Sequence, residues 1–269
     1  MGHVAEVTEV EKVYAPDLLK KVPKVLLEGL DGEQHCWYLG YGSNMSEKSF
    51  LQRRGIRPLK SLVVNAPEVE LSFNLPGMPY VEPRFANVTL NAEAEDGGPQ
   101  HPWGKGLIGV AYYVTLEDMA TIFRTEGGGS SYQIIQVDCR EIGGSGQTIR
   151  ANTLFANDPR RLRNQLGQPS PRYMNLLRTG AQEKSLPKEY RDYLDNIEVY
   201  QRTSPRQLLG LMLLGTILLP VFLFGMLVGK LLQNKKGESP RWMQRIIQTI
   251  FRAGWSFHDI FKPIFGSGE

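Results

Sequence analysis

Short apolar stretches between Cys36 and Tyr200 predict a folded domain that mixes strands with helices. Branched and aromatic residues bounded by turn residues predict strands at 37–41, 69–73, 107–114, 132–137 and 148–155. Helical spacing and end signals predict helices at 45–54, 115–124, 158–165, 172–183 and 187–196. Asn44 suits the N-cap of the first of these helices. Because strands and helices do not alternate regularly, the pattern favours the α+β class.

A different pattern begins at Leu208, since no charged residue stands between Leu208 and Gly229. As a helix this run spans about 33 Å, and a bilayer core is about 30 Å thick. We therefore predict a transmembrane segment at 207–230. Pro220 near its middle leaves two arrangements open, a single span or a hairpin that re-enters the membrane.

Basic and apolar side chains follow this run at helical spacing. Trp242, Ile246 and Phe257 belong to the apolar set, and Arg245 and Arg252 lie between them. The segment 231–269 is therefore predicted to be a basic amphipathic tail that lies in a lipid headgroup interface. An ordinary helix packed on the folded domain is the alternative.

The charge balance and the cysteine count exclude several classes of protein. The chain has 31 Lys and Arg against 28 Asp and Glu, a net charge of +3, which does not indicate a nucleic-acid partner. Cys36 and Cys139 cannot form a disulfide framework. The histidines at 3, 35, 101 and 258 lack metal-ligand spacing, so no metal site is predicted.

Residues 1–35 are predicted to be an extension without a secretory signal peptide. Charged residues interrupt its first 30 positions, and no apolar core of a signal sequence is present. Two unpaired cysteines also fit a reducing compartment. We therefore expect the domain at 36–200 to be cytosolic and anchored to a membrane by the later apolar segment.

Three places in the domain are candidates for chemistry. Residues 41–45, Tyr-Gly-Ser-Asn-Met, lead from a strand through a glycine turn to a helix start, where backbone N–H groups suit an anion. Glu126 stands beside three glycines, where a partly buried carboxylate could carry a proton. Residues 170–173, Ser-Pro-Arg-Tyr, fit a capped helix start with Tyr173 in its first turn. Taken alone, each pattern is more often structural: the first as an ordinary turn, the second as a solvated loop acid and the third as a packed tyrosine.

In this order, the three motifs together resemble those of the γ-glutamylcyclotransferase family. That family has a YGSN motif after its first strand, here residues 41–44, and a Glu-Gly before a tyrosine-bearing strand, here Glu126-Gly127 and Tyr132. Its Ser-Pro-x-Tyr helix start is here 170–173, followed by Gly-Ala at 180–181 and Leu-Pro-x-x-Tyr at 186–190. Asn44 favours this family over the glutathione-degrading ChaC-type cyclotransferases, which usually show YGSL. The resemblance covers about residues 36–197 and implies a small mixed β-barrel or sheet with flanking helices.

The resemblance also implies a reaction, in which the α-amine of a γ-glutamyl compound attacks its own γ-carbonyl and releases 5-oxoproline. No cofactor is implied, because nucleophile and electrophile belong to one small-molecule substrate. Glu126 matches the catalytic position and would act as base and then as acid. The substrate-binding residues implied are Tyr41, Gly42, Ser43, Asn44, Met45, Tyr132 and Tyr173. A homodimer stays open.

Some features depart from the family pattern. Three glycines follow Glu126 where the family has one glycine and then an apolar residue, the spacing to Tyr132 is a residue shorter, and residues 91–105 look like an added loop. One alternative is therefore a membrane-tethered binding protein that has lost activity. Another is a cyclotransferase for γ-glutamylamines or glutathione-conjugated metabolites. The leaving group is not predicted.

Overall fold

The structure is a computed structural model of the 269-residue chain. It describes residues 22, 32–46, 50, 54–91, 103–126, 132–156, 162–163, 167–231 and 241–269. The described residues fall into two compact units. The barrel unit draws on Met1–Leu71, Asn87–Asn157 and Leu176–Asn196, and the helix-pair unit draws on Ser72–Ala86, Asp158–Asn175 and Ile197–Glu269.

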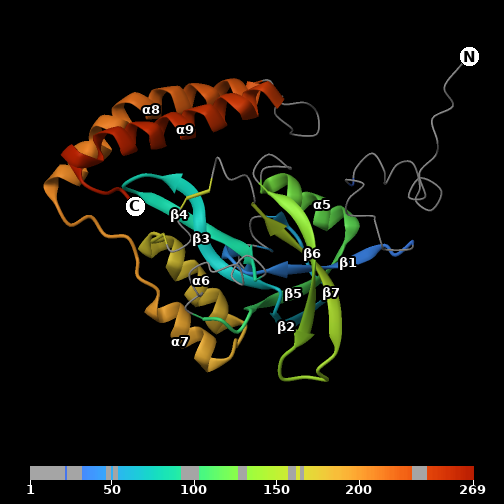
Figure 1. The fold of residues 1–269 in the computed structure, drawn as a ribbon. Coiled ribbons are helices and arrows are strands. Elements are labelled where there is room, and N and C mark those ends of the chain that lie inside the picture. The colour runs from blue at the N-terminus through green and yellow to red at the C-terminus, as the bar shows by residue number, and fades with distance from the viewer. Residues whose placement is uncertain are drawn as a thin grey trace, which may run out of the picture. The chain divides into compact units, whose positions relative to one another are not determined.

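Five strands of the barrel unit close into a barrel in the order β1-β5-β2-β6-β7 (Figure 1). Their bounds are β1 His35–Gly40, β2 Lys60–Ala66, β5 Leu107–Thr115, β6 Gln133–Glu141 and β7 Thr148–Phe155. Strand β1 pairs antiparallel with β5, which sets Tyr38 opposite Tyr112, and parallel with β7, which sets Tyr38 opposite Asn152. Because β1 is paired on both sides, the barrel fixes the position of its last residue, Gly40, and so of the turn that follows it.

Strands β3 (Val69–Met78) and β4 (Glu82–Leu90) form a separate two-stranded sheet whose residues are shared between the units. The sequence predicts only the first half of β3. It does not predict β4 or β2.

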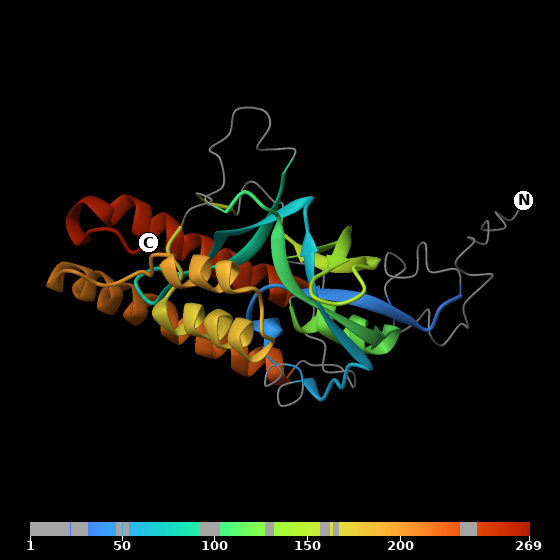
Figure 2. The same cartoon turned by 90° about the horizontal axis from the view of Figure 1, so that it is seen from below.

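The shorter helices are α5 (Leu116–Thr125), α6 (Pro171–Glu183) and α7 (Lys188–Asn196). Thr115 caps α5, because its Oγ1 accepts from the Asp118 N–H at 3.1 Å. This is the start that the sequence predicts. Figure 2 shows α7 alongside α6.

The turn after β1 differs from the prediction. A 3₁₀ turn, η2 (Ser43–Met45), follows β1, and the Met45 N–H donates to the Gly42 carbonyl at 3.0 Å. Gly42 occupies the N-cap position, no side chain caps the turn, and extended Ser46 ends it. The prediction that Asn44 caps a helix is therefore wrong, because its side chain is bound elsewhere. Residues 47–49 and 51–53 of that helix lie outside the described residues.

Other predictions fall wholly or partly outside the described residues. They are the extension at 1–35 apart from residues 22 and 32–35, most of the loop at 91–105, the glycines at 127–129, and the start of the tail at 232–240. Of the helix predicted at 158–165, only Leu162 and Arg163 are described, and neither is helical.

The helix-pair unit contains α8 (Pro205–Leu231) and α9 (Arg241–Phe265), which lie side by side (Figure 1). Helix α8 continues through Pro220, so a hairpin centred on Pro220 is not formed. Within the described parts of the chain, no helix is both long and apolar enough to span a membrane. The transmembrane segment predicted at 207–230 is therefore not supported. The apolar run instead forms one helix of a pair in which Leu214 and Trp255 are buried.

Candidate active site

Aromatic rings support the chain where it leaves β1. Tyr38 of β1 packs on Phe50 with ring centroids 5.9 Å apart, and Phe50 packs on Tyr112 of β5 at 4.4 Å. The Tyr112 hydroxyl donates to the Met45 carbonyl at 2.7 Å. The Met45 side chain is itself buried. The far end of the 41–45 motif is therefore fixed to the barrel core.

The near end of the motif is anchored as well. The buried Tyr41 donates its hydroxyl proton to the Leu154 carbonyl of β7 at 2.7 Å. Gly42 and Ser43, between the two anchors, are half-buried. The Ser43 hydroxyl accepts and donates no hydrogen bond among the described residues. The motif thus leaves Gly42 and Ser43 partly exposed, while Tyr41 and Met45 hold the turn in place.

Asn44 connects the turn to the catalytic candidate. Its side chain is only 6% exposed. Its Nδ2 donates to the Tyr38 hydroxyl at 2.7 Å and to Glu126 Oε1 at 3.3 Å. Its Oδ1 accepts from Arg54 Nη1 at 2.5 Å. With donors and acceptor all used, Asn44 has one orientation and holds the turn against Glu126.

Glu126 is the C-cap residue of α5 and forms an ion pair with Arg54. Arg54 Nη2 donates to Glu126 Oε1, and Arg54 Nε donates to Thr125 Oγ1 at 3.0 Å. The Glu126 side chain is 25% exposed and that of Arg54 12%. Among the described residues, both donors to the carboxylate reach Oε1 and none reaches Oε2. The donors of Arg54 and Asn44 therefore fix one of the two carboxylate oxygens, Oε1.

The second half of α6 approaches the same turn. A Cβ atom on Gly180 would lie 3.0 Å from Met45 Cβ and 3.1 Å from the Ser46 backbone nitrogen. Ser46 Oγ also donates to Glu183 Oε2 at 3.2 Å. The Gly-Ala pair that follows the Ser-Pro-x-Tyr motif is thus explained by close packing against the 41–46 turn.

The two predicted tyrosines belong to different units. Tyr132 precedes β6 in the barrel unit and is half-buried. Tyr173 belongs to the helix-pair unit, where its hydroxyl accepts from the Ala86 N–H at 3.2 Å and its ring meets Phe85 edge-on at 5.0 Å. Its own N–H donates to Ser170 Oγ at 3.1 Å, which confirms the predicted helix start.

Sequence reasoning brought Asn44 and Glu126 to one site but missed Tyr38 and Arg54. Tyr38 reads as an ordinary strand residue. Arg54 reads as the last residue of a helix, and no motif marks it.

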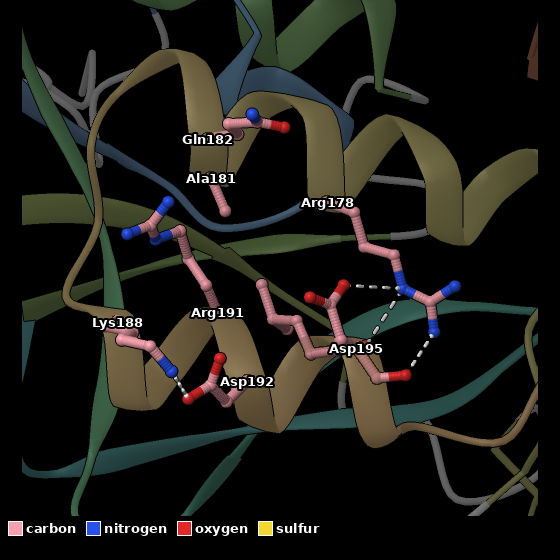
Figure 3. A pocket seen from close by; sticks show the side chains of 8 residues that line it. Arg178, Ala181, Gln182, Lys188, Arg191, Asp192 and Asp195 are labelled. Carbon is pink, nitrogen blue, oxygen red and sulfur yellow. Dashed lines mark hydrogen bonds and ion pairs between the residues drawn. The ribbon is translucent and has the colours of Figure 1, made fainter.

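A cavity of about 280 Å³ lies between α6 and α7 (Figure 3). None of the predicted site residues lines it. Its charges are largely paired, since Lys188 binds Asp192 at 2.6 Å and Arg178 binds Asp195 at 3.4 Å. We assign it no part in the reaction.

In the described residues, one group has metal-ligand composition. The donor atoms of His258, Asp259 and Glu269 lie within 4.8 Å of one another. Arg163 binds both carboxylates, and the Gly268 N–H donates to His258 Nε2. Protein donors already engage these atoms, so the group does not fit a cation.

Comparison with known proteins decides the family. Residues 106–194 match the AIG2-like family. Over 246 residues the chain is 31% identical to the γ-glutamyl cyclotransferase gliK of Aspergillus fumigatus. The aligned region covers 87% of this chain and 89% of that protein. The chain belongs to the γ-glutamyl cyclotransferase family. The family member gliK of Claviceps purpurea is 30% identical over 231 residues, covering 84% of this chain and 99% of that protein. A solved γ-glutamyl cyclotransferase shares the fold, with a TM-score of 0.50 and 21% identity over 63% of this chain and 92% of its own.

The protein is therefore an enzyme of the γ-glutamyl cyclotransferase class. The expected α+β fold, with a small barrel and flanking helices, is confirmed.

Proposed function

We propose that this cyclotransferase converts a γ-glutamyl compound to 5-oxoproline with Glu126 as both general base and general acid. The supporting observation is the placement of Glu126, which is partly exposed and tied through Asn44 to the 41–45 turn. One carboxylate oxygen is held by Arg54 and Asn44, and Oε2 accepts from neither of them. A general base needs such a positioned and accessible oxygen.

The proposed reaction is an intramolecular aminolysis. Glu126 takes a proton from the α-ammonium of the substrate, and the resulting amine attacks the γ-carbonyl carbon to form a new C–N bond. The bond from that carbon to the departing nitrogen then breaks. The two protons that the ammonium loses both end on the departing nitrogen, which leaves as an ammonium. The protons balance within the substrate, and Glu126 relays them.

We assign the substrate's glutamyl end to the turn. The backbone of Gly42, Ser43 and Asn44 would hold it and stabilise the carbonyl oxygen as charge develops. The half-buried state of Gly42 and Ser43, between two buried anchors, supports this assignment. Tyr41 and Met45 would shape the site from behind the turn. By the family pattern, Tyr132 would close the site and hydrogen-bond the substrate.

The test is formation of 5-oxoproline by the purified full chain. γ-Glutamyl-alanine, glutathione and a γ-glutamylamine serve as substrates. We expect Glu126→Gln to lower kcat by about 10²–10⁴-fold, the usual contribution of a general acid–base group. Glu117→Gln, an exposed glutamate on the same helix, is the matched control and should stay near wild type. Full turnover by Glu126→Gln would contradict the mechanism.

Two outcomes would favour the alternatives. No 5-oxoproline from any substrate, with binding retained, would indicate a binding protein. Turnover confined to glutathione conjugates or γ-glutamylamines would show a pocket reshaped for other leaving groups, for which the added residues at 91–105 are the candidate.

We further propose that α8 and α9 hold the enzyme on a lipid bilayer, with the catalytic residues in the cytosol. Among the described residues, every large apolar side chain that is exposed, apart from Leu59 and Val81, belongs to these two helices. Such a concentrated patch is unusual for a monomer in water. Cys36 and Cys139 are both free thiols, which suits a reducing compartment.

A further inference from the structure

The segment Gly266–Glu269, which follows α9, is bound along its main chain by other residues of the helix-pair unit. We use the word groove for the residues that bind it, which are Tyr80, Arg84, Arg163, Gln207 and His258. The Tyr80 N–H donates to the carbonyl of residue 268 at 2.9 Å, and the Tyr80 hydroxyl donates to that of residue 266 at 3.2 Å. Gln207 Nε2 donates to the carbonyl of residue 267 at 2.8 Å. His258 Nε2 accepts from the N–H of residue 268 at 2.8 Å. The groove therefore recognises main-chain groups at three successive positions.

The groove also contains a built carboxylate site, which the Glu269 side chain occupies. Arg163 binds this carboxylate with two donors, Nε to Oε2 at 2.8 Å and Nη2 to Oε1 at 2.9 Å. Arg84 Nη2 forms a further ion pair with it. The Arg163 guanidinium lies 4.2 Å from the centre of the Trp255 ring, which orients it. Paired, bidentate arginines are the usual protein site for a carboxylate.

Arg84 shows that Glu269 does not satisfy this site completely. Its side chain is only 2% exposed, yet Nε and Nη1 have no hydrogen-bond partner among the described residues. A buried guanidinium donor without an acceptor is costly, and a finished core contact rarely leaves two. Glu269 therefore leaves part of the hydrogen-bonding capacity of the Arg84 guanidinium unused.

The shape of the groove adds a second requirement. A Cβ atom on Gly268 would lie 2.9 Å from both His258 Cδ2 and the Tyr80 ring, so a side chain at this position would press on two buried rings and glycine fits best. The segment 266–268 carries no large apolar side chain, and hydrogen bonds hold its main chain.

We propose that the helix-pair unit contains a binding site for acidic peptides in which glycine precedes the acidic residue, and that Gly266–Glu269 occupies this site in cis. The proposal does not depend on the cyclotransferase reaction. Its ligand class follows from the two arginines and from the contact at Gly268.

The test uses the full chain and a fluorescent acetyl-Gly-Ser-Gly-Glu-amide peptide, with fluorescence polarisation as the readout. In the wild-type protein the tethered segment competes at an effective concentration on the order of millimolar, so we expect weak binding. Glu269→Gln weakens only the cis ligand and should bind the peptide at least about 10-fold more tightly than wild type, since charge-assisted hydrogen bonds are lost. Arg163→Met in that background should remove the binding.

A second variant weakens the cis segment through its backbone and leaves the two arginines unchanged. Gly266 has φ +83°, which a side chain rarely adopts, so Gly266→Val should strain the connection to α9 and also increase peptide binding. Peptides ending in Gly-Gln or carrying Ala in place of the second glycine should bind neither variant. Equal binding of these control peptides, or no saturable binding of the Glu peptide to either variant, would show that the segment only packs and would overturn the proposal.

Discussion

A few contacts orient the carboxylate of Glu126, the residue that we propose as the general base and acid. Arg54 and Asn44 both donate to Oε1, and Asn44 is itself fixed by Tyr38. The carboxylate therefore cannot rotate freely. Arg54 contacts Glu126, Asn44 and Thr125 at once, and we therefore propose that it positions Glu126 for the reaction.

We predict that Arg54→Gln lowers kcat with little change in KM. Losing the guanidinium frees the carboxylate to rotate, and misplacement of a reacting group by about 1 Å can cost roughly 10²-fold in rate. Arg54→Lys should restore part of kcat, because it keeps the charge but cannot bridge Glu126 and Asn44 together. Steady-state kinetics of 5-oxoproline release provides the measurement.

The exposed Arg57 gives a matched control for Arg54, and Arg57→Gln should behave as wild type. In the Glu126→Gln background, Arg54→Gln should cause little further loss, because both changes act on one group. A full additional loss in the double variant would mean that Arg54 does not act through Glu126.

At the scale of secondary-structure elements, the sequence predicts helix starts correctly where the capping residue bonds to a residue a few positions along the chain. Thr115 with Asp118 and Ser170 with Tyr173 mark helix starts that the structure confirms. The Asn44 cap failed because Tyr38, Arg54 and Glu126, distant or unmarked in sequence, use its side chain instead. Strand β4 was missed since Pro83 lies inside it, and proline argues against a strand unless tertiary pairing decides.

The approach of α6 to the 41–46 turn yields a prediction for Gly180. Replacing a glycine inside a helix usually stabilises it, by up to about 1 kcal/mol. Here Gly180→Val should instead destabilise by about 1–3 kcal/mol, because the side chain would press on Met45 and the Ser46 backbone. It should also reduce kcat/KM by displacing the turn. Gln182→Val, exposed on the same helix, controls for the helix propensity of valine. Urea unfolding and kinetics measure the two effects, and unchanged values for Gly180→Val would contradict this account of the packing.

Three titratable groups at the 266–269 segment, His258, Asp259 and Glu269, make the free energy of unfolding decrease as pH falls. The Arg163 hydrogen bond lowers the pKa of Asp259. Burial raises the pKa of Glu269, but Arg163 and Arg84 outweigh it, so that pKa is also lowered. Burial lowers the pKa of His258. For all three groups the unfolded chain takes up protons at a higher pH than the folded chain, so stability decreases as pH falls.

We therefore expect the free energy of unfolding to begin falling below about pH 6.5, where unfolded histidine protonates, and to fall further below about pH 4.3, where unfolded carboxylates protonate. The carboxylate contribution is lost as pH passes through the lowered pKa values of the folded state. Asp259→Asn should flatten the lower part of this curve. Urea titrations from pH 7 to pH 3 test it, and identical curves for wild type and variant would exclude Asp259 as a contributor.

For the whole molecule, the sequence predicted the fold class and the enzyme family. It did not predict which segments of the chain make up each of the two units. The helix-pair unit takes in Ser72–Ala86, far from α8 and α9 in sequence. Arg84 and Tyr80 in that stretch bind the 266–269 segment, and no local pattern reveals such long-range partners. The apolar run at 208–229 predicted a transmembrane helix, and its composition does not reveal that this run forms a helix paired with α9.

The exposed apolar side chains of α8 and α9 lead to a prediction for membrane association. Phe224 of α8 is 68% exposed and Ile260 of α9 is 70% exposed. If the pair lies on a bilayer, burying each such side chain contributes about 1.5–3 kcal/mol, so Phe224→Lys and Ile260→Lys should each reduce vesicle binding by roughly 10-fold or more. The assay is co-flotation of the full chain with vesicles containing anionic lipid. Leu59→Lys, at a position 64% exposed in the barrel unit, is the control and should float as wild type does. If wild type remains at the bottom of the gradient, or if Leu59→Lys is impaired as much as the helix variants, then α8 and α9 do not attach the enzyme to lipid, and their apolar surface must be covered in another way.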